Sequence, residues 1–331
     1  MGELVRGIWR DQRPAGEEAR GRFIRGEAHF RSWVTPDGAA GPTGRGGFRA
    51  EPGRYHLYVS PACPWSHRAI IYRALKRLDK VVPMTVVDWH MGSEGWTFST
   101  RDGATPDPVY GAKRLSEIYI RAEPDYTGKV TVPVLFDRRE GTVVSNESAD
   151  IIRMLETAFD AFTNIDINAR PPGLRAEIDA LNTRIYQTVN NGVYRAGFAR
   201  SQDAYEEAYR AVAESLEWLE ARLARRRYLV ANHPTEADWR LFPTLVRFDP
   251  VYYIHFKCSL RRLVEYQNLF AYTRDLYQVP SVAATVNLVH IKGHYYTSHP
   301  SINPLGIVPL GPAIDFSAPH GREAMTRAHA A

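Results

Sequence analysis

The sequence predicts a mixed α/β domain followed by an all-helical domain, and two patterns carry that prediction. Between residues 55 and 158, short runs of β-branched and aromatic residues alternate with apolar residues at helical spacing. The resulting order of elements is β-α-β-α-β-β-α. From residue 174 to about residue 289, the apolar residues recur only at helical spacing. The turn-forming stretch Pro171-Pro172-Gly173 separates the two halves.

Each element of the first domain has its own local signal. The first strand is an alternating, aromatic-rich run that ends at Pro61, and the second centres on Val86. The third is interrupted by Pro133, which is poorly suited to a central strand. A glycine-rich loop at residues 90–108 precedes the second helix, and loops as long as this are usually functional or disordered. We expect strands at residues 55–59, 81–89, 130–137 and 142–145, helices at residues 63–78, 114–122 and 147–158, and the loop at residues 90–108.

The second domain shows amphipathic helical periods and one clear helix start. Thr235, followed three residues later by Asp238, has the pattern of a capping box. We expect helices at residues 174–191, 203–226, 236–248, 259–277 and 280–290. The predicted segments are an N-terminal extension at 1–50, an α/β domain at 51–160, a helical domain at 172–300 and an extended, proline-rich tail at 301–331.

Composition excludes several classes of protein. The chain has 331 residues and a net charge of +5, and its basic residues form no stripe interleaved with aromatics, so we expect no nucleic-acid partner. No apolar run approaches the roughly 18 residues of a transmembrane helix, and the N-terminus lacks a signal-peptide core. Two cysteines cannot build a disulfide framework, which favours the cytoplasm. His290, His294 and His299 lack a cysteine or acidic companion, so a structural role is a better interpretation than a metal site.

Cys63 is the leading candidate for a nucleophile. It follows a strand and a proline turn and opens a helix, in the run Cys63-Pro64-Trp65-Ser66. Unpaired N–H groups and the helix dipole stabilise a thiolate at that place, which lowers the pKa of the thiol. Because position 66 is serine, no resolving cysteine lies one turn away, and an external thiol must cleave a mixed disulfide. The alternative is an inert, buried cysteine.

Two further motifs suit a peptide ligand. A cis peptide bond before Pro133 would free the backbone of Val132 to bind a ligand, as in thioredoxin-like proteins; the alternative is an ordinary proline of an edge strand. Glu147 and Ser148 lie where a strand gives way to a helix. There, the helix N-terminus and a hydroxyl suit a carboxylate, and Glu147 suits an ammonium. The alternative is plain helix capping by Asn146 or Ser148.

Taken in order, these motifs resemble the glutathione transferase superfamily, and the cysteine points to its Cys-type members. The resemblance implies a thioredoxin-like α/β domain joined to an all-α domain, the glutathione transferase fold. The strings at residues 60–68, 247–258, 290–299 and 303–312 are more specific. They resemble the glutathionyl-hydroquinone reductases, the Xi class, from about residue 20 to residue 315.

The resemblance implies a reaction and the residues that perform it. Cys63 would take the glutathionyl group from a glutathionyl-hydroquinone, and a second glutathione would release it as glutathione disulfide. Glutathione is then the co-substrate, and no metal, flavin or nicotinamide is required. The family also implies a homodimer joined through the helical domain. The implied glutathione-binding residues are Trp96, Lys129, Val132, Pro133, Glu147 and Ser148, and the implied hydroquinone-binding residues are Tyr194, Tyr252 and Tyr295.

Two other functions remain open from the sequence. One is a general Cys-type thiol transferase or reductive dehalogenase. The three tyrosines favour an aromatic substrate and so argue for the hydroquinone reductase instead. The other is a non-catalytic glutathione-binding scaffold, because a fold alone does not give a function. Cys63 argues against the scaffold. Cys258 lacks a helix-start context, which suggests a structural role for it.

Overall fold

The computed structural model describes residues 2–11 and 19–326. Contacts group the chain into two compact units. Among the described residues, the first unit comprises residues 2–11, 26–167 and 284–308, and the second comprises residues 19–25, 168–283 and 309–326. The parts of the predicted extension and tail at residues 12–18 and 327–331 lie outside the described residues. The predicted domain boundaries stay a prediction, and the contact grouping differs from them in assigning residues 284–308 to the first unit.

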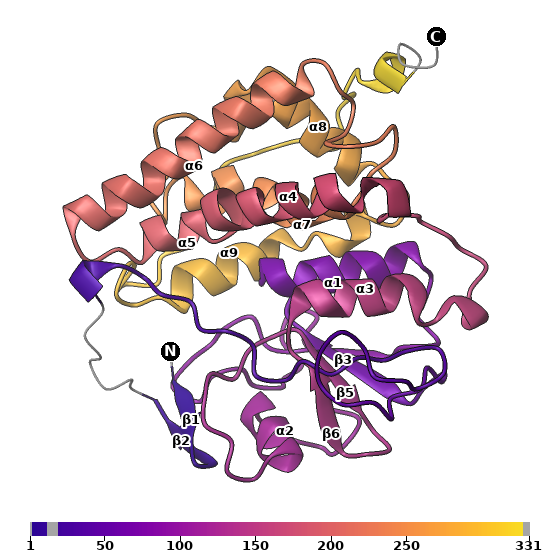
Figure 1. The fold of residues 1–331 in the computed structure, drawn as a ribbon. Coiled ribbons are helices and arrows are strands. Elements are labelled where there is room, and N and C mark those ends of the chain that lie inside the picture. Colours follow the sequence, from indigo (N-terminus) through magenta and orange to yellow (C-terminus); the bar gives the residue numbers. More distant parts are fainter. Residues whose placement is uncertain (1, 12–18, 327–331) are drawn as a thin grey trace. The chain divides into compact units, whose positions relative to one another are not determined.

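A four-stranded mixed sheet forms the centre of the first unit, in the order β4-β3-β5-β6 (Figure 1). Strand β3 pairs parallel with β4 and antiparallel with β5, with Leu57 opposite Met84 and Tyr58 opposite Val134. All residues of β3 and β5 are buried, so the alternation seen in the sequence of the first strand does not correspond to one exposed face. The strands are β3 (Tyr55–Val59), β4 (Met84–Val86), β5 (Val134–Asp137) and β6 (Thr142–Ser145).

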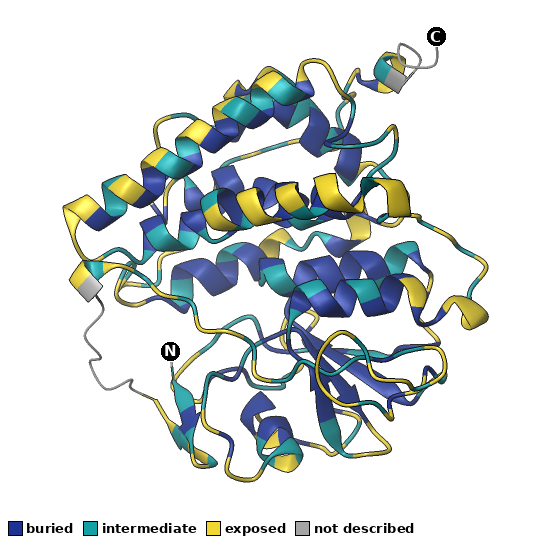
Figure 2. Ribbon diagram, viewed as in Figure 1, coloured by how far each residue is buried: buried dark blue, intermediate teal, exposed yellow. Residues whose placement is uncertain are grey.

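Helices cover both faces of this sheet. Helices α1 and α3 pack against each other on one face, and α2 lies on the other (Figure 1). Figure 2 shows that the sides of α1 and α3 toward the sheet are buried, as their apolar spacing predicts. The helices are α1 (Pro64–Leu75), α2 (Leu115–Ala122) and α3 (Ser148–Thr157). A later helix, α9 (Leu288–Thr297), belongs to the same unit.

The N-terminal segments of the first unit are docked on it. Strands β1 (Glu3–Val5) and β2 (Ile8–Arg10) form an antiparallel pair, and Leu4 exchanges two backbone hydrogen bonds of 2.9 Å with Gly128. Residues 30–32 run beside β6, where the Ser32 amide donates to the Val144 carbonyl at 2.9 Å. The extension therefore covers an edge strand that would otherwise expose unpaired backbone groups.

The second unit is helical, as the sequence predicts. Its Thr235–Asp238 capping box is confirmed, and the carboxylate of Asp238 also accepts hydrogen bonds from the Leu229 amide at 2.9 Å and the Tyr272 hydroxyl at 2.7 Å. Asp238 thereby ties the start of α7 to α8. The helices are α4 (Arg175–Ile185), α5 (Gly192–Gly197), α6 (Gln202–Leu223), α7 (Glu236–Arg247) and α8 (Gln267–Tyr277), with π-helical turns at Tyr186–Asn190 and Phe248–Tyr252.

Two of the helices predicted for the second half of the sequence have the wrong limits. The helix expected at residues 259–277 begins only at Gln267, because the carboxylate of Asp249 captures the backbone amides of Leu263 and Val264 at 2.5 and 3.2 Å. The helix expected at residues 280–290 is instead α9, which starts after Asn287. The Asn287 side chain caps α9 by accepting from the His290 amide at 3.0 Å. The short helix α5 and the strands β1 and β2 had no predicted counterpart.

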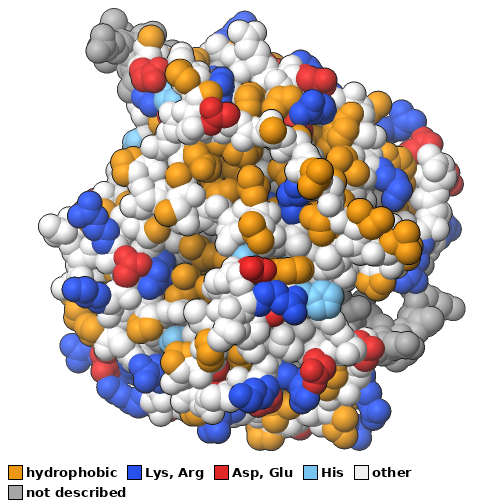
Figure 3. All heavy atoms as spheres, turned by 180° about the vertical axis from the view of Figure 1, so that it is seen from behind, with side chains coloured by type: hydrophobic (Ala, Val, Ile, Leu, Met, Phe, Trp, Pro, Cys, Tyr) orange, Lys and Arg blue, Asp and Glu red, His pale blue; other side chains and the backbone are white. Residues whose placement is uncertain are grey.

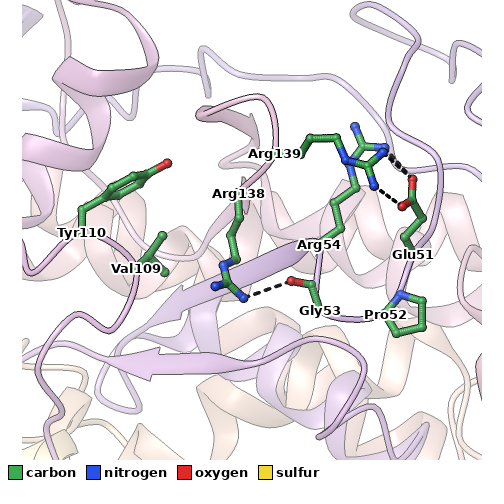
Figure 4. Close-up of a pocket in the computed structure, with 8 residues that line it drawn as sticks. All are labelled: Glu51, Pro52, Gly53, Arg54, Val109, Tyr110, Arg138 and Arg139. Carbon is green, nitrogen blue, oxygen red and sulfur yellow. Dashed lines mark hydrogen bonds and ion pairs between the residues drawn. The ribbon is translucent and has the colours of Figure 1, made fainter.

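Surface charges are mixed in sign, and several of them form ion pairs. On the face shown in Figure 3, basic and acidic side chains are interspersed. A hollow of about 440 Å³ lies at the start of β3, whereas Cys63 follows the other end of that strand (Figure 4). Its arginines are engaged locally: Arg54 by Asp137, Arg138 by the Gly53 carbonyl and Arg139 by Glu51. We therefore assign this hollow no ligand.

Candidate active site

Cys63 sits at the N-cap of α1, with Pro64 as the first helical residue. Its backbone is extended, and its carbonyl accepts the first helical hydrogen bond, from the His67 amide at 3.0 Å. The side chain is half-buried, and Sγ lies 3.6 Å from the Val132 carbonyl oxygen. The Cys63 side chain makes no capping hydrogen bond to the first turn of α1, and the dipole of that helix favours a thiolate at this place. The position suits an attacking thiolate.

The turn before Cys63 is held by two serines. The Ser60 amide donates to the Ser66 hydroxyl at 3.3 Å, and the Ala62 amide donates to the Ser60 hydroxyl at 3.3 Å. Ser66 stands where a second cysteine would complete a dithiol motif, and here it ties the helix to the preceding turn. The sulfur is therefore placed by a rigid turn and lacks a neighbouring thiol one helical turn away.

Two basic residues of α1 follow the cysteine, and both are buried. His67 contacts the Thr285 hydroxyl at 2.8 Å through Nε2. The guanidinium of Arg68 lies 4.6 Å from the Trp65 ring centre and donates to the Ser148 hydroxyl at 3.5 Å. Arg68 thus links the nucleophile's helix to the first turn of α3. Nothing in the sequence marked this contact, because it joins residues 80 positions apart.

The peptide bond between Val132 and Pro133 is cis. Both residues are buried, and Val132 belongs to the apolar cluster against which Cys63 packs. Strand β5 starts directly after Pro133, so the proline precedes the sheet ladder rather than interrupting it. The Val132 backbone is thereby set beside the sulfur, where an extended peptide can pair with it.

Glu147 and Ser148 open α3, and the capping residue is Glu147 itself. Its Oε1 accepts from the Ala149 amide at 2.8 Å and from the Ser148 hydroxyl at 3.4 Å. The alternative expectation, capping by Asn146 or Ser148, is therefore wrong, because the Asn146 side chain forms hydrogen bonds with Phe30 and Tyr119 instead. A carboxylate in the cap remains able to meet an ammonium group, while the helix dipole favours a carboxylate nearby.

Trp96 lies on the long loop and is mostly buried, with 6% of its surface exposed. Its ring stacks on His294 of α9, with ring centres 4.8 Å apart and planes inclined by 23°. Helix α9 holds this loop at three more points. His294 Nδ1 lies 2.9 Å from the Trp89 carbonyl, the His290 ring 2.6 Å from the Asp102 carbonyl, and the His90 ring 3.0 Å from the Thr297 hydroxyl.

His290 and His294 thus pack against this loop and contact its backbone, while the structural role expected for the three histidines stays a prediction. A Cβ on Gly293 would approach the Trp89 ring to 2.7 Å, so only glycine lets α9 lie this close to the loop. The described residues contain no cluster of three or more potential metal ligands.

Lys129 is half-buried in the segment that leads to Val132, and its carbonyl accepts from the Tyr126 hydroxyl at 3.1 Å.

Two of the three tyrosines expected to bind the ring lie together. In the second unit, Tyr194 on α5 and Tyr252 have ring centres 6.2 Å apart. Phe256 joins them, stacking on Tyr252 at 5.5 Å and meeting Tyr194 edge-on at 5.5 Å. Tyr295 belongs to the first unit, on α9, and is 1% exposed. Phe256 was not expected from the sequence, because an isolated phenylalanine is indistinguishable from a core residue.

Cys258 is fully buried, and burial raises the pKa of its thiol above the ordinary value. It is therefore poorly suited to nucleophilic or resolving chemistry. Neither cysteine forms a disulfide bond. Within the described residues, no helix is long and apolar enough to cross a membrane.

Family models match both halves of the chain. Residues 62–158 match the model for the N-terminal domain of glutathione S-transferase. Residues 202–275 match the model for the C-terminal domain of the same family. The first match contains the segment from Cys63 to the end of α3, and the second runs from the start of α6 through α7 and into α8.

Curated relatives match over nearly the whole chain. The glutathionyl-hydroquinone reductase YqjG of Escherichia coli (strain K12) is 53% identical over 324 residues, covering 98% of this chain and 99% of the relative. The glutathionyl-hydroquinone reductase PcpF of Sphingobium chlorophenolicum is 49% identical over 313 residues, covering 95% and 97%.

Solved structures agree with this similarity. The glutathione-bound structure of YqjG from Escherichia coli K-12 superimposes with a TM-score of 0.90 at 52% identity, covering 97% of this chain and 99% of that one. A Xi class glutathione transferase from Natrialba magadii gives a TM-score of 0.89 at 44% identity, covering 97% and 96%.

Proposed function

The chain belongs to the glutathione transferase superfamily and, within it, to the Xi-class glutathionyl-hydroquinone reductases, and we propose that it reduces glutathionyl-hydroquinones with glutathione. The observation that carries the proposal is the half-buried thiol of Cys63 at the start of α1, 3.6 Å from the Val132 carbonyl. A single thiol in that position requires an external thiol to complete a turnover. Glutathione supplies it.

The reaction balances with glutathione as the only co-reactant. The Cys63 thiolate attacks the sulfur of the conjugate, so that an S–S bond forms and the carbon–sulfur bond to the ring breaks. The electron pair of the broken bond stays on the ring carbon, which takes a proton, and the hydroquinone leaves. A second glutathione thiolate then attacks the glutathionyl sulfur, releasing glutathione disulfide and restoring the Cys63 thiolate.

The glutathione-binding roles follow the local chemistry. The Val132 backbone beside Pro133 pairs with the peptide, and Trp96 covers it. Glu147 takes the ammonium of the γ-glutamyl end, while Ser148 and the first turn of α3 take its carboxylate. Lys129 contributes a positive charge for the glycyl carboxylate, as a point charge without the bidentate fork of an arginine. Tyr194, Tyr252 and Tyr295 bind the hydroquinone ring by stacking and through their hydroxyl groups.

A substrate comparison tests the proposed function. We expect a glutathionyl-hydroquinone to be reduced with a kcat/KM at least about fivefold above that of a small aliphatic glutathionyl disulfide, because aromatic side chains favour a flat ring by about 1 kcal/mol or more. The measurement follows glutathione disulfide formation with each substrate at fixed glutathione. A clear preference for the aliphatic substrate would instead favour a general thiol transferase, and no turnover of either would favour a binding role.

We also propose a homodimer joined through the helical domain. Two large apolar side chains in that unit support it, since Ile254 and Leu260 are 53% and 76% exposed. Light scattering after gel filtration is expected to give twice the chain mass of 37.5 kDa. Leu260→Glu should lower that mass toward one chain, whereas a monomeric wild type would contradict the proposal.

The proposed compartment is the cytoplasm. The reaction consumes reduced glutathione, which suits a reducing compartment. Cell fractionation tests this assignment, and recovery of the protein from an oxidising compartment would contradict it.

A further inference from the structure

Two segments of the first unit hold glutathione in the proposed function, residues 131–133 and residues 146–148. We propose that the buried hydroxyl group of Tyr119 is the positioning group that fixes these two segments relative to each other, and thereby sets the affinity for glutathione. This inference rests on the proposed role of the two segments. Tyr119 itself lies on α2 and contacts no substrate in the proposed reaction.

The hydroxyl of Tyr119 contacts both segments directly. It donates to the Thr131 carbonyl at 2.8 Å and accepts from the Thr131 amide at 3.2 Å. It also accepts from the side-chain amide of Asn146 at 3.2 Å. The same amide group lies 3.4 Å from the Thr131 hydroxyl, which closes a small buried network. Thr131 immediately precedes Val132, and Asn146 immediately precedes Glu147.

Asn146 is fixed from its other side by the N-terminal extension. Its side-chain oxygen accepts from the Phe30 amide at 3.1 Å, and its own backbone amide donates to the Phe30 carbonyl at 3.2 Å. Asn146 therefore cannot serve as the cap of α3, which explains why Glu147 takes that place. The position of Glu147 therefore depends on the preceding Asn146 side chain, which forms hydrogen bonds with Phe30 and with Tyr119.

The ring that carries the hydroxyl has little freedom. Tyr119 is completely buried, with its ring 5.1 Å from Tyr126 and 5.9 Å from Phe30, both edge-on. Burial raises the pKa of Tyr119, so the hydroxyl keeps its proton and remains a donor to Thr131 at neutral pH. The tightly packed ring holds the hydroxyl group in place. Through its hydrogen bonds, this hydroxyl group fixes the distance between the two segments.

Removing this hydroxyl should loosen the site before any ligand binds. Without it, the Thr131 amide and carbonyl lose their described partner, and the side-chain NH2 group of Asn146 keeps, toward this segment, only the 3.4 Å contact with the Thr131 hydroxyl. Glutathione would then have to order the two segments on binding, and that ordering reduces the affinity. We expect the affinity to fall by about tenfold, which corresponds to about 1.4 kcal/mol.

The test compares Tyr119→Phe with Tyr55→Phe. Tyr55 is a matched control, since it is equally buried in the same unit and its hydroxyl donates to a backbone carbonyl, that of Arg49, at 2.6 Å. Calorimetric titration with S-methylglutathione, which has no free thiol, measures binding without turnover. We expect about a tenfold weaker binding for Tyr119→Phe and less than about a twofold change for Tyr55→Phe.

A kinetic readout separates positioning from general loosening. For Tyr119→Phe the KM for the glutathionyl-hydroquinone, whose glutathionyl part occupies this site, should rise by about the same factor as the dissociation constant, while kcat at saturating substrate stays within about twofold. Wild-type affinity in Tyr119→Phe, or an equal loss in Tyr55→Phe, would overturn the inference. Absence of S-methylglutathione binding by the wild type would also overturn it. If the wild type binds this ligand but does not reduce glutathionyl-hydroquinones, the proposed function fails and the binding ratio still decides the inference.

Discussion

Replacing Cys63 by alanine is expected to lower the turnover of a glutathionyl-hydroquinone by more than about 10³-fold, the scale on which loss of a nucleophile acts. The first step forms a bond to the Cys63 sulfur, and neighbouring Ser66 cannot substitute for a thiolate at neutral pH. The measurement is glutathione disulfide formation with wild type and variant. Mass spectrometry of wild type treated with substrate alone should show one glutathionyl group on Cys63.

Cys258→Ala is the matched control. Its thiol is fully buried and its pKa is raised by burial, so turnover should stay within about twofold while stability falls by about 1 kcal/mol, as for loss of a small buried group. Turnover that survives in Cys63→Ala, or that disappears equally in Cys258→Ala, would remove Cys63 from the mechanism. Loss of turnover in Cys63→Ala with retained binding of S-methylglutathione would separate chemistry from binding.

The second large effect concerns stability. Arg54→Met is expected to lower the free energy of unfolding by about 3–5 kcal/mol, because it leaves a buried carboxylate without its cation. Asp137 has no exposed surface, and Arg54 donates to it twice, at 2.9 and 2.6 Å. This pair joins the residue before β3 to the last residue of β5. Urea titration of wild type and variant measures the loss.

Two further variants make this prediction specific. Arg139→Ala removes an ion pair with Glu51 in which the arginine side chain is 58% exposed, so it should cost no more than about 1 kcal/mol. The double variant Arg54→Met/Asp137→Leu should recover part of the loss, since it leaves no buried charge unpaired. A single variant as stable as Arg139→Ala would contradict the assignment of Arg54–Asp137 as a structural ion pair.

Much of the candidate site could be predicted because its signals are local in the chain. A cysteine before a proline at a helix start, a Val-Pro pair before a strand, and a Glu-Ser pair at the next helix each span a few residues. The fold class and the order of elements of the first domain also follow from short-range periodicity. The long similarity to a family added the substrate class, which no local pattern states.

Other features depend on contacts between distant residues and leave no local signal. The sequence predicts the last helix at residues 280–290, whereas α9 spans Leu288–Thr297. Its limits are set by the Asn287 cap and by packing of Gly293 against Trp89. The cap of α3 was also misassigned, because Phe30 and Tyr119 engage Asn146 from 116 and 27 residues away. An isolated tyrosine such as Tyr119 reads as core in any sequence pattern.

By itself, the sequence determined the two-part fold and the family and indicated Cys63 as the candidate nucleophile, since these rest on residue types at short spacing and on long matching strings. Only the tertiary structure decided how the segments proposed to bind glutathione are held. It brought Val132 to the Cys63 sulfur, stacked Trp96 on His294, and joined Thr131 to Asn146 through Tyr119. The physical reason is that hydrogen bonds and ring contacts form wherever packing brings groups together, and sequence spacing does not encode that packing.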